Sequence, residues 1–187
     1  VFPCLFGSAL RQTGVDALLD ALGRFVDVPA RGAEFGAHVF KIARDEKGAR
    51  LTFLKVTGGT LTVKQTLSGE GWEEKADQLR LYSGAKFQSL DEAEAGAVVA
   101  VTGLSHTFPG QGLGAEPDWA GAVLQPVLTY RLELADGTDP HTAMQKLRQL
   151  EEEDPQLHIV WNNGEIHAQL MGEVQMEILQ RLIRERL

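Results

Sequence analysis

The chain has 187 residues, a formal net charge of -8 at pH 7 and 43% hydrophobic residues. This length accommodates one ordinary domain or two small ones, and the apolar content excludes a disordered tail. The negative charge disfavours unaided binding to a bare phosphate backbone, so we expect no DNA partner, although a local basic patch in a larger assembly is compatible with it. The single cysteine, Cys4, excludes an internal disulfide and is typical of a reducing cytosol.

The N-terminal stretch VFPCLFGSAL predicts a strand and not a targeting signal. It has no charged residue before its apolar run, so we do not interpret it as a signal peptide. No apolar run in the chain approaches the roughly 20 residues that a membrane-spanning helix requires, so no membrane partner is expected. We interpret residues 1–6 as a buried strand in mid-fold, and we expect the chain to be a segment of a longer protein.

A helix follows the turn Gly7-Ser8-Ala9-Leu10. Thr13 is placed to cap this helix, and Asp16 favours its positive end. One apolar stripe runs along it, formed by Val15, Leu18, Leu19, Leu22, Phe25 and Val26. A strand and one helix cannot bury this stripe by themselves, so we expect the bulk of their domain upstream of the chain.

Short apolar runs separated by turn residues occupy the stretch from Glu34 to about Ser105. The predicted strands are residues 35–43, 50–56, 60–67, 78–82, 86–90 and 97–102. Short β-branched strands at this spacing predict a small antiparallel barrel or sandwich, and we prefer a barrel because closure removes open edges. Residues 106–125 are rich in glycine and proline and are predicted to be a linker.

The remaining residues, 126–187, are predicted to form a split βαβ fold whose last strand is missing. A strand over 126–135 precedes a helix that Asp139 caps, with Pro140 at its first position, and that Pro155 ends. A strand, a tight turn, a second strand and a second helix follow. The missing strand would leave a sheet edge open, so we expect marginal stability for this part of the chain.

The dipeptide Asn163-Gly164 is the strongest hairpin signal, because both residues accept the positive φ of a type I′ turn. A two-residue loop there predicts the pairs Trp161 with Ile166, Ile159 with Ala168, and Leu157 with Leu170. All six side chains would share one face. The last helix carries the apolar stripe that would cover this face, formed by Val174, Ile178, Leu179, Leu182 and Ile183.

The five histidines do not make a metal site in this prediction. His158 and His167 fall on the sheet face opposite Trp161 and lack further ligands, so we interpret them as solvated strand histidines. The other three, His38, His106 and His141, are scattered without metal-ligand spacing.

Three other candidate sites have ordinary explanations. The carboxylates Glu151 to Asp154 point around a helix end, so we interpret them as a solvated face and not as a cation site. The glycines at 110, 112 and 114 are not followed by a Lys-Ser/Thr pair and therefore predict a connector. Cys4, in the expected buried strand, has no cationic neighbour that would activate it as a nucleophile.

The turn Gly7-Ser8-Ala9-Leu10 is a different kind of candidate. A strand that ends there before a helix would present backbone amides and a small hydroxyl at the carboxyl edge of a sheet, where open α/β folds bind ligands. An ordinary strand-to-helix turn would account for the same residues.

The order of these elements resembles that of translational GTPases of the elongation factor G type. The residues resemble them too: FKI (40–42), RLTF (50–53) and VTGGTL (56–61) are similar to the family's barrel domain, and LEEEDP (150–155) and MGEVQMEI (171–178) to its third domain. The resemblance implies the end of an α/β GTPase domain over 1–30, a translation-factor β-barrel over 31–105, a linker over 106–125 and a ferredoxin-like domain over 126–187.

Two details refine this resemblance. GEVQME (172–177) looks more like the ribosomal protection proteins of tetracycline resistance, since elongation factor G usually carries histidine and leucine where Gln175 and Met176 stand. By the same resemblance Ser8, Ala9 and Leu10 correspond to the last guanine-recognition motif. The turn at Asn163-Gly164 departs from the family pattern because it is shorter.

The resemblance implies GTP and Mg²⁺ as cofactors of the longer protein, the ribosome (rRNA and ribosomal proteins) as its partner, and a cytoplasmic location. The barrel would dock on the small ribosomal subunit while the third domain relays the nucleotide state. The chain lacks a phosphate loop, a switch aspartate and an Asn-Lys-x-Asp motif, so by itself it should neither bind GTP tightly nor hydrolyse it. Our first hypothesis is therefore a segment of a ribosome-dependent GTPase of the tetracycline-resistance type, which displaces the drug from the ribosome. The alternatives are a translocase or termination factor of the same superfamily and a stand-alone binding module without nucleotide chemistry.

Overall fold

The computed structural model describes residues 2–27, 30–121, 124–135 and 137–186. The chain divides into two compact units, Val1–Arg31 and Gly32–Leu187, which are described separately below. None of the described helices is both long enough and apolar enough to span a membrane.

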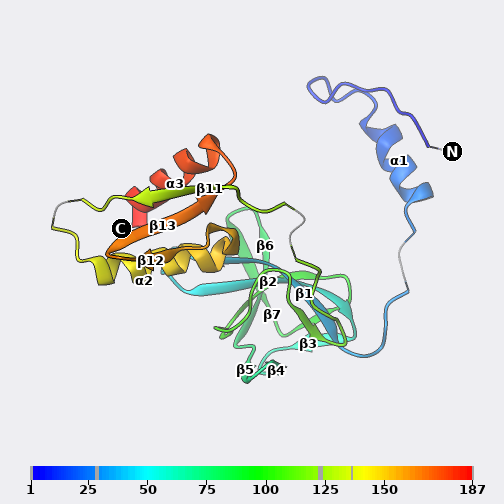
Figure 1. Ribbon diagram of the computed structural model, residues 1–187. Helices are drawn as coiled ribbons and strands as arrows, with labels where there is room; N and C mark the ends of the chain where they lie inside the picture. Colours follow the sequence, from blue (N-terminus) through cyan, green and yellow to red (C-terminus); the bar gives the residue numbers. More distant parts are fainter. Residues whose placement is uncertain (1, 28–29, 122–123, 136, 187) are drawn as a thin grey trace. The chain divides into compact units, whose positions relative to one another are not determined.

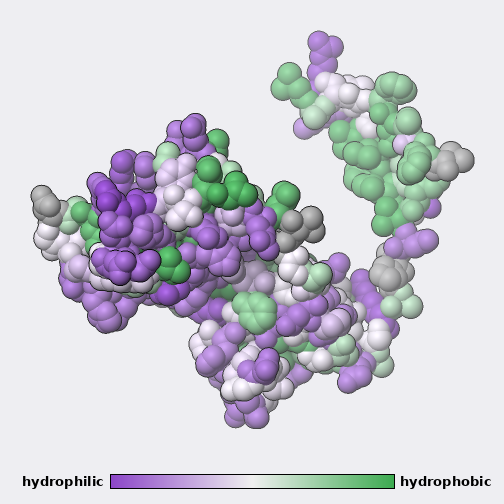
Figure 2. All heavy atoms as spheres, viewed as in Figure 1, coloured by the Kyte–Doolittle hydropathy of each residue, from purple (hydrophilic) through white to green (hydrophobic). Residues whose placement is uncertain are grey.

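The first unit contains one helix, α1 (Val15–Phe25), as its apolar stripe predicts (Figure 1). Thr13 does not cap it: the N-cap is Gly14 with a φ of 80° and no side-chain cap bond, because Thr13 instead pairs its backbone with Ser8. The predicted strand is not formed over the described residues 2–7, which have no neighbouring strand to take their backbone hydrogen bonds. No described residue of α1 is buried, and hydrophobic atoms cover much of this unit's visible surface in Figure 2.

The second unit begins with an antiparallel six-stranded sheet in the order β10-β1-β2-β9-β6-β7. Its strands are β1 (Gly36–Arg44), β2 (Arg50–Gly58), β6 (Gln78–Ser83), β7 (Lys86–Leu90), β9 (Val98–Thr102) and β10 (Gly112–Gly114). Two small sheets pair β3 (Thr60–Thr62) with β8 (Glu92–Glu94) and β4 (Thr66–Gly69) with β5 (Trp72–Lys75). We call residues 36–114 the barrel region.

All the strands predicted for the barrel are present, and the run 60–67 divides into β3 and β4. The division falls at Lys64, whose φ of 66° turns the chain between them. Inward-facing side chains from all three sheets share one core, including the fully buried Val39, Leu54 and Leu79. The strands β5 and β8 were not predicted because their sequences, WEEK and EAE, carry little apolar alternation.

The strand β10 lies inside the range predicted to be a linker. Thr107, Gln111 and Leu113 are buried here, and β10 pairs with β1. A side chain at Gly112 would collide with the carbonyl oxygens of Glu116 and Pro117. The glycine therefore marks a close approach of two backbone segments, which composition alone does not distinguish from a flexible connector.

The C-terminal part has the predicted strand and helix order. Its elements are β11 (Leu128–Leu132), α2 (Pro140–Glu153), a 3-10 turn η1 (Pro155–Leu157), β12 (Val160–Asn162), β13 (Glu165–Leu170) and α3 (Glu173–Arg186). The sheet order is β11-β13-β12 (Figure 1). Leu147 and Leu150 of α2 and Leu179 of α3 join the same core over this sheet. We call residues 128–186 the split βαβ region.

The predicted hairpin is correct at its turn and wrong farther away. Asn163 and Gly164 have φ values of 51° and 85°, and Trp161 pairs with Ile166. The pairing of Leu157 with Leu170 is not formed, because Asp154 accepts a hydrogen bond from the Gln156 amide and Pro155 begins the 3-10 turn. Leu157 and Ile159 are buried in the same core without being strand residues.

Candidate functional site

The C-terminal end of α2 carries the acidic run Glu151 to Asp154, and each of its carboxylates has a different partner. Glu151 accepts a hydrogen bond from the Ile159 amide at 2.8 Å and pairs with Arg148. Glu153 pairs with Arg186 of α3 at 2.8 Å. The interpretation of this run as a solvated face is therefore wrong.

Asp154 connects α2 to both segments that follow it. One carboxylate oxygen accepts the Gln156 amide at 3.2 Å, and the other accepts Gln175 Nε2 of α3 at 3.1 Å. Gln175 also accepts a hydrogen bond from the Met171 amide at 2.7 Å. A single side chain of α3 therefore ties the start of that helix to the end of α2.

Glu152 links the two regions of the second unit. Its Oε2 accepts hydrogen bonds from Arg44 Nη2 at 2.9 Å and from Arg50 Nε at 3.1 Å. These arginines end β1 and begin β2, where the two strands pair with one another. Their positive charges also lie next to the negative end of the α2 dipole, which strengthens the contact. We call Glu152, Arg44 and Arg50 the arginine junction.

Arg50 is held in the junction by groups of the barrel region. Its Nη1 donates to Thr52 Oγ1 at 3.1 Å, to the Leu104 carbonyl at 2.8 Å and to Thr107 Oγ1 at 2.9 Å. The hydroxyls of Thr52 and Thr107 are 2.7 Å apart. The guanidinium is 12% exposed, whereas Glu152 is 41% exposed. The Arg50 side chain is therefore held in place by its hydrogen bonds to the barrel region, whereas the Glu152 side chain is less restrained.

Two cavities flank the arginine junction. One, of about 370 Å³, lies beside Arg50, His106 and Arg148. The other, of about 200 Å³, lies between Ile42 of β1 and the apolar side chains of Leu150 and Leu179. The contact between the regions thus combines the ion pairs of the arginine junction with a pocket lined by apolar side chains of β1, α2 and α3.

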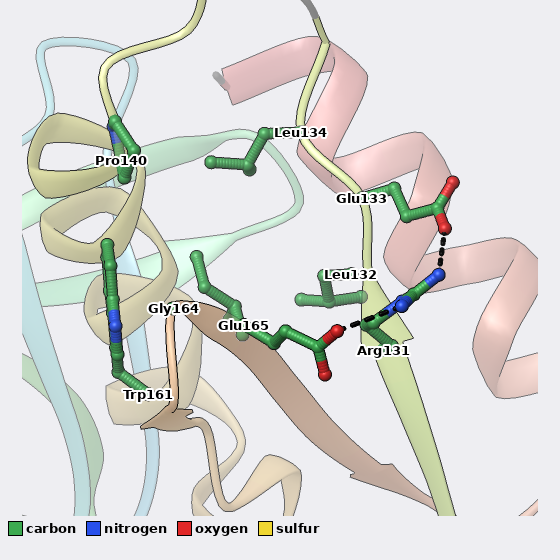
Figure 3. A pocket seen from close by; sticks show the side chains of 9 residues that line it. Arg131, Leu132, Glu133, Leu134, Pro140, Trp161, Gly164 and Glu165 are labelled. Carbon is green, nitrogen blue, oxygen red and sulfur yellow. Dashed lines mark hydrogen bonds and ion pairs between the residues drawn. The ribbon is translucent and has the colours of Figure 1, made fainter.

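A third cavity, of about 270 Å³, belongs to the split βαβ region (Figure 3). Arg131 lies at its wall between Glu133 and Glu165 and donates to Glu165 Oε1 at 2.9 Å. The hydrogen bonds from Arg131 to Glu165 and then to Glu133 raise the arginine pKa. Trp161 and Pro140 form the opposite side, and the arginine is already satisfied, so this cavity offers no free cation to a ligand.

The histidines and the cysteine are not arranged for catalysis. His158 is exposed with a φ of 37° and lies outside β12, which corrects its prediction as a strand residue. His167 lies on β13 as predicted, with Nε2 3.5 Å from Glu165. Cys4 is exposed and not buried in a strand. Within the described residues, no group of three or more His, Cys, Asp or Glu side chains could hold a metal ion.

Ser105, His106 and Glu74 form a cluster that the sequence did not suggest. Ser105 Oγ and Glu74 Oε1 lie 3.0 Å and 2.8 Å from the same His106 nitrogen, Nδ1. A catalytic triad needs the hydroxyl and the carboxylate on opposite ring nitrogens, so this cluster is structural. Burial opposes the charge of Glu74, but hydrogen bonds from Ser105 and His106 outweigh it and lower the Glu74 pKa to about 2.

The turn at Ser8, Ala9 and Leu10 lies in the first unit. The Ser8 amide donates to the Thr13 carbonyl at 3.0 Å, and its hydroxyl accepts the Arg11 amide at 3.4 Å. The Leu10 side chain is 96% exposed. These residues could form at most one edge of a guanine site, and the chain has no phosphate loop for the phosphates. The chain's residues therefore do not fit a complete GTP and Mg²⁺ site, and no nucleotide step is assigned to it.

The outer face of the barrel sheet carries an aromatic cluster that the sequence reasoning missed. Phe53 of β2, Tyr82 of β6 and Phe87 of β7 follow one another with ring centroids 5.6 Å and 5.4 Å apart. The alternation of β6 indicates that Tyr82 faces away from the core, because Leu79 is buried. This cluster could have been predicted only if the order of the strands in the sheet had been known.

Comparison with known proteins places these features in a family context. Residues 34–113 match the family model described as elongation factor G domain 2. The chain is 32% identical to elongation factor G 1 of Geobacter sulfurreducens, an alignment that covers 99% of this chain and 31% of that protein. It is 29% identical to elongation factor G 2 of Syntrophus aciditrophicus, covering 98% and 31%. The chain thus spans about a third of the length of these relatives.

A solved structure shows the same fold. The crystal structure of a protein from Thermus thermophilus matches with a TM-score of 0.80 at 23% identity, and covers 96% of this chain and 29% of that one. The family model covers the barrel region, and the two relatives align with nearly the whole chain. Together these matches support the interpretation of the chain as a segment of a protein of the elongation factor G superfamily.

Proposed function

We propose that this chain is the central segment of a ribosome-dependent translational GTPase of the elongation factor G type. The barrel region docks on the ribosome, and the split βαβ region relays the nucleotide state of the GTPase domain. The longer protein uses GTP and Mg²⁺ in the cytoplasm, and Ser8, Ala9 and Leu10 form one edge of its guanine site. Within this proposal, residues 1–30 end the GTPase domain, the barrel domain extends from residue 31 through β10 and not only to residue 105, and the ferredoxin-like domain begins at residue 126.

The observation that carries the relay is the arginine junction. Arg50 is fixed to the barrel region by three acceptors on its Nη1, whereas Glu152 is fixed to the rest of the chain only through α2. A rotation of the split βαβ region would break both ion pairs of Glu152 together, and the flanking cavities leave room for this movement. In the proposed relay, the second arrangement is the one in which both ion pairs are broken.

Glu152→Gln in the longer protein tests this function. Glu185→Gln on the exposed surface of α3 is the charge-matched control. Glu152→Gln should keep ribosome-stimulated GTP hydrolysis but slow the movement of tRNA and mRNA that follows, because the joined arrangement of the two regions loses both of the ion pairs that stabilise it. An equal effect of both substitutions would contradict the relay, and absence of ribosome stimulation in the unmodified protein would contradict the whole proposal.

The tetracycline-resistance type is a second candidate. It rests on GEVQME (172–177), in which Gln175 joins Met171 to Asp154. The test is rescue of translation by the longer protein in the presence of tetracycline. Failure to rescue, with intact ribosome-stimulated GTP hydrolysis, would leave the translocase or termination factor. A coding sequence without a phosphate-loop motif upstream of Val1 would favour a stand-alone binding module instead.

A further inference from the structure

The outer face of the barrel sheet is hollowed by a groove of about 440 Å³. Its walls are Leu51, Phe53, Tyr82 and Phe87 of β2, β6 and β7, with Arg80 of β6 and the turn 45–47 between β1 and β2. We call this hollow the aromatic groove. It lies on the side of the sheet opposite the barrel core, because Leu54 and Leu79, next to Phe53 and Arg80, are fully buried on the inside.

The three rings of the aromatic groove continue a row that begins with Phe40 of β1, outside the groove. Phe40, Phe53, Tyr82 and Phe87 succeed one another at centroid distances of 6.3, 5.6 and 5.4 Å. Interplanar angles of 41° to 55° leave the rings tilted and not closed onto each other. The two end rings are open to solvent, since Phe40 is 40% exposed and Phe87 is 47% exposed. A row of partly exposed rings on a sheet face offers apolar contact surface to a ligand.

Cations are attached to this row. Arg80 Cζ lies 4.5 Å from the Phe87 centroid, and Lys41 Nζ lies 5.6 Å from the Phe53 centroid. Asp45 fixes Arg80 through a 3.0 Å ion pair, so the guanidinium plane is held against Phe87. This pairing of a planar cation with a ring is the arrangement on which a further flat ring can stack.

The charges of the groove differ from those of the chain. Its lining carries the cations Arg44, Lys47 and Arg80 against the carboxylates Asp45 and Glu46. Glu152 pairs with Arg44 and Asp45 pairs with Arg80, so the positive charge that faces a ligand comes from Lys47 and from Lys41 beside the groove, opposed by Glu46. This cluster of cations occurs in a chain whose net charge is -8. An occupant of the groove should therefore combine a flat apolar surface with negative charge. Unstacked nucleotides have both properties, because each base has two faces and each phosphate is anionic.

We propose that the aromatic groove binds an unstacked base of single-stranded RNA, which stacks on Phe53, Tyr82 and Phe87 while its phosphates face Lys41 and Lys47. Base-paired RNA does not fit, because its bases are enclosed in the duplex and only its backbone is accessible. The inference rests on the proposed function, since a ribosome would present such a base to the barrel region. It goes further by assigning the chemistry and the residues of the contact.

The test uses the full chain and a fluorescently labelled single-stranded oligoadenylate at low salt, with binding followed by anisotropy. Phe87→Ala should weaken binding about fivefold or more, as expected for the loss of one stacking contact. Phe108→Ala is the matched control, because Phe108 is 45% exposed and lies outside the groove. Equal weakening by the two substitutions would overturn the assignment of the site.

Three further arms decide the chemistry. Phe87→Leu preserves most of the apolar volume, and hence folding, but removes the π face, so it should weaken binding as Phe87→Ala does; unchanged binding would overturn the stacking. The same oligonucleotide annealed to its complement should bind more weakly, and equal binding would indicate a purely electrostatic contact. AMP should displace the RNA only in large excess, and displacement at equal concentration would overturn the assignment to RNA.

This test is separate from that of the proposed function. It needs neither ribosomes nor GTP. A longer protein that showed no ribosome stimulation, while its groove still bound single-stranded RNA in a Phe87-dependent way, would defeat the proposed function and leave this inference standing. If RNA binding did not depend on Phe87 while ribosome stimulation was intact, the ribosome contact would lie on another surface.

Discussion

The barrel region and the split βαβ region enclose their cores in different ways. In the barrel region, the six-stranded sheet and both small sheets contribute to a core of 14 buried apolar residues. In the split βαβ region, one three-stranded sheet is covered by α2 and α3, and the core has 8 buried apolar residues. In the described part of the chain, β11 pairs with β13 on one side only. We therefore expect the sheet of the barrel region to be better protected from solvent than the sheet of the split βαβ region.

The largest effect on the free energy of unfolding is expected from substitutions in the cores of the two regions. Leu54→Ala should lower the free energy of unfolding by about 3 kcal/mol, because this side chain is fully buried and the cavity cannot collapse in an enclosed core. Hydrogen exchange measured by mass spectrometry should show the loss of protection across β1, β2 and β9. In the unmodified chain the split βαβ region should already exchange faster than the barrel region.

Leu170→Ala is the counterpart in the split βαβ region, where Leu170 is also fully buried. Its loss of protection should be confined to β11, β13 and the two helices. Equal protection of the two regions in the unmodified chain, or a loss that spreads over both after either substitution, would contradict the difference in enclosure and show one cooperative unit.

The barrel region should lose stability in acid because of Glu74, which lies on β5. Its pKa is lowered from 4.5 to about 2, so its stabilising contribution is fully present above pH 4.5 and is lost as the pH falls toward about 2. Glu74→Gln should reduce stability by about 1 to 2 kcal/mol near neutral pH, after allowance for solvent screening, and the deficit should shrink through this window. Urea unfolding across the window measures it.

Glu73→Gln is the control, because Glu73 is the exposed neighbour on the same strand. It should leave the pH dependence of unfolding unchanged. A deficit for Glu74→Gln that stays constant down to about pH 2 would mean that the cluster with Ser105 and His106 does not hold the carboxylate ionised.

The sequence predicts an element best where the interactions that stabilise it lie within one short segment. Asn163-Gly164 accepts positive φ at both positions and fixes the turn and the pair Trp161 with Ile166. Asp139 caps α2 by accepting hydrogen bonds from His141 and Thr142 amides, as predicted. The strands of the barrel with apolar alternation were also predicted, because burial of every second side chain is visible in a single strand.

Prediction fails where the reason lies in a distant segment. The partners of Glu152 are more than 100 positions away in the sequence, so a run of four carboxylates looks like a solvated face. The glycines around Gly112 look like a connector, although they permit a close backbone approach. Leu157 lies in a 3-10 turn and not in a strand, because the hydrogen bond from the Gln156 amide to the Asp154 side chain competes with strand pairing. The aromatic groove cannot be predicted without knowing how the strands that carry its rings are arranged in the sheet.

A smaller effect is expected at the arginine junction, where the two regions meet. A double-mutant cycle of Glu152→Gln and Arg44→Gln should give a coupling energy of about 1 kcal/mol, because one partner is largely exposed and the other is partly buried. Urea unfolding of the four proteins measures it. High salt should reduce the coupling. A coupling of zero at low salt would mean that the ion pair between Glu152 and Arg44 does not help to join the regions.

The smallest expected effect concerns the hairpin of the split βαβ region. Asn163→Ala should lower the free energy of unfolding by about 0.5 to 1 kcal/mol, because alanine tolerates the left-handed φ at this position less well than asparagine does. Asn163→Gly is the matched control and should be close to neutral, since glycine accepts this φ freely. If the split βαβ region is the weaker one, hydrogen exchange should show the effect of alanine in β12 and β13 without change in the barrel region. Equal destabilisation by alanine and glycine would mean that the Asn163 side chain, and not its backbone conformation, stabilises the turn.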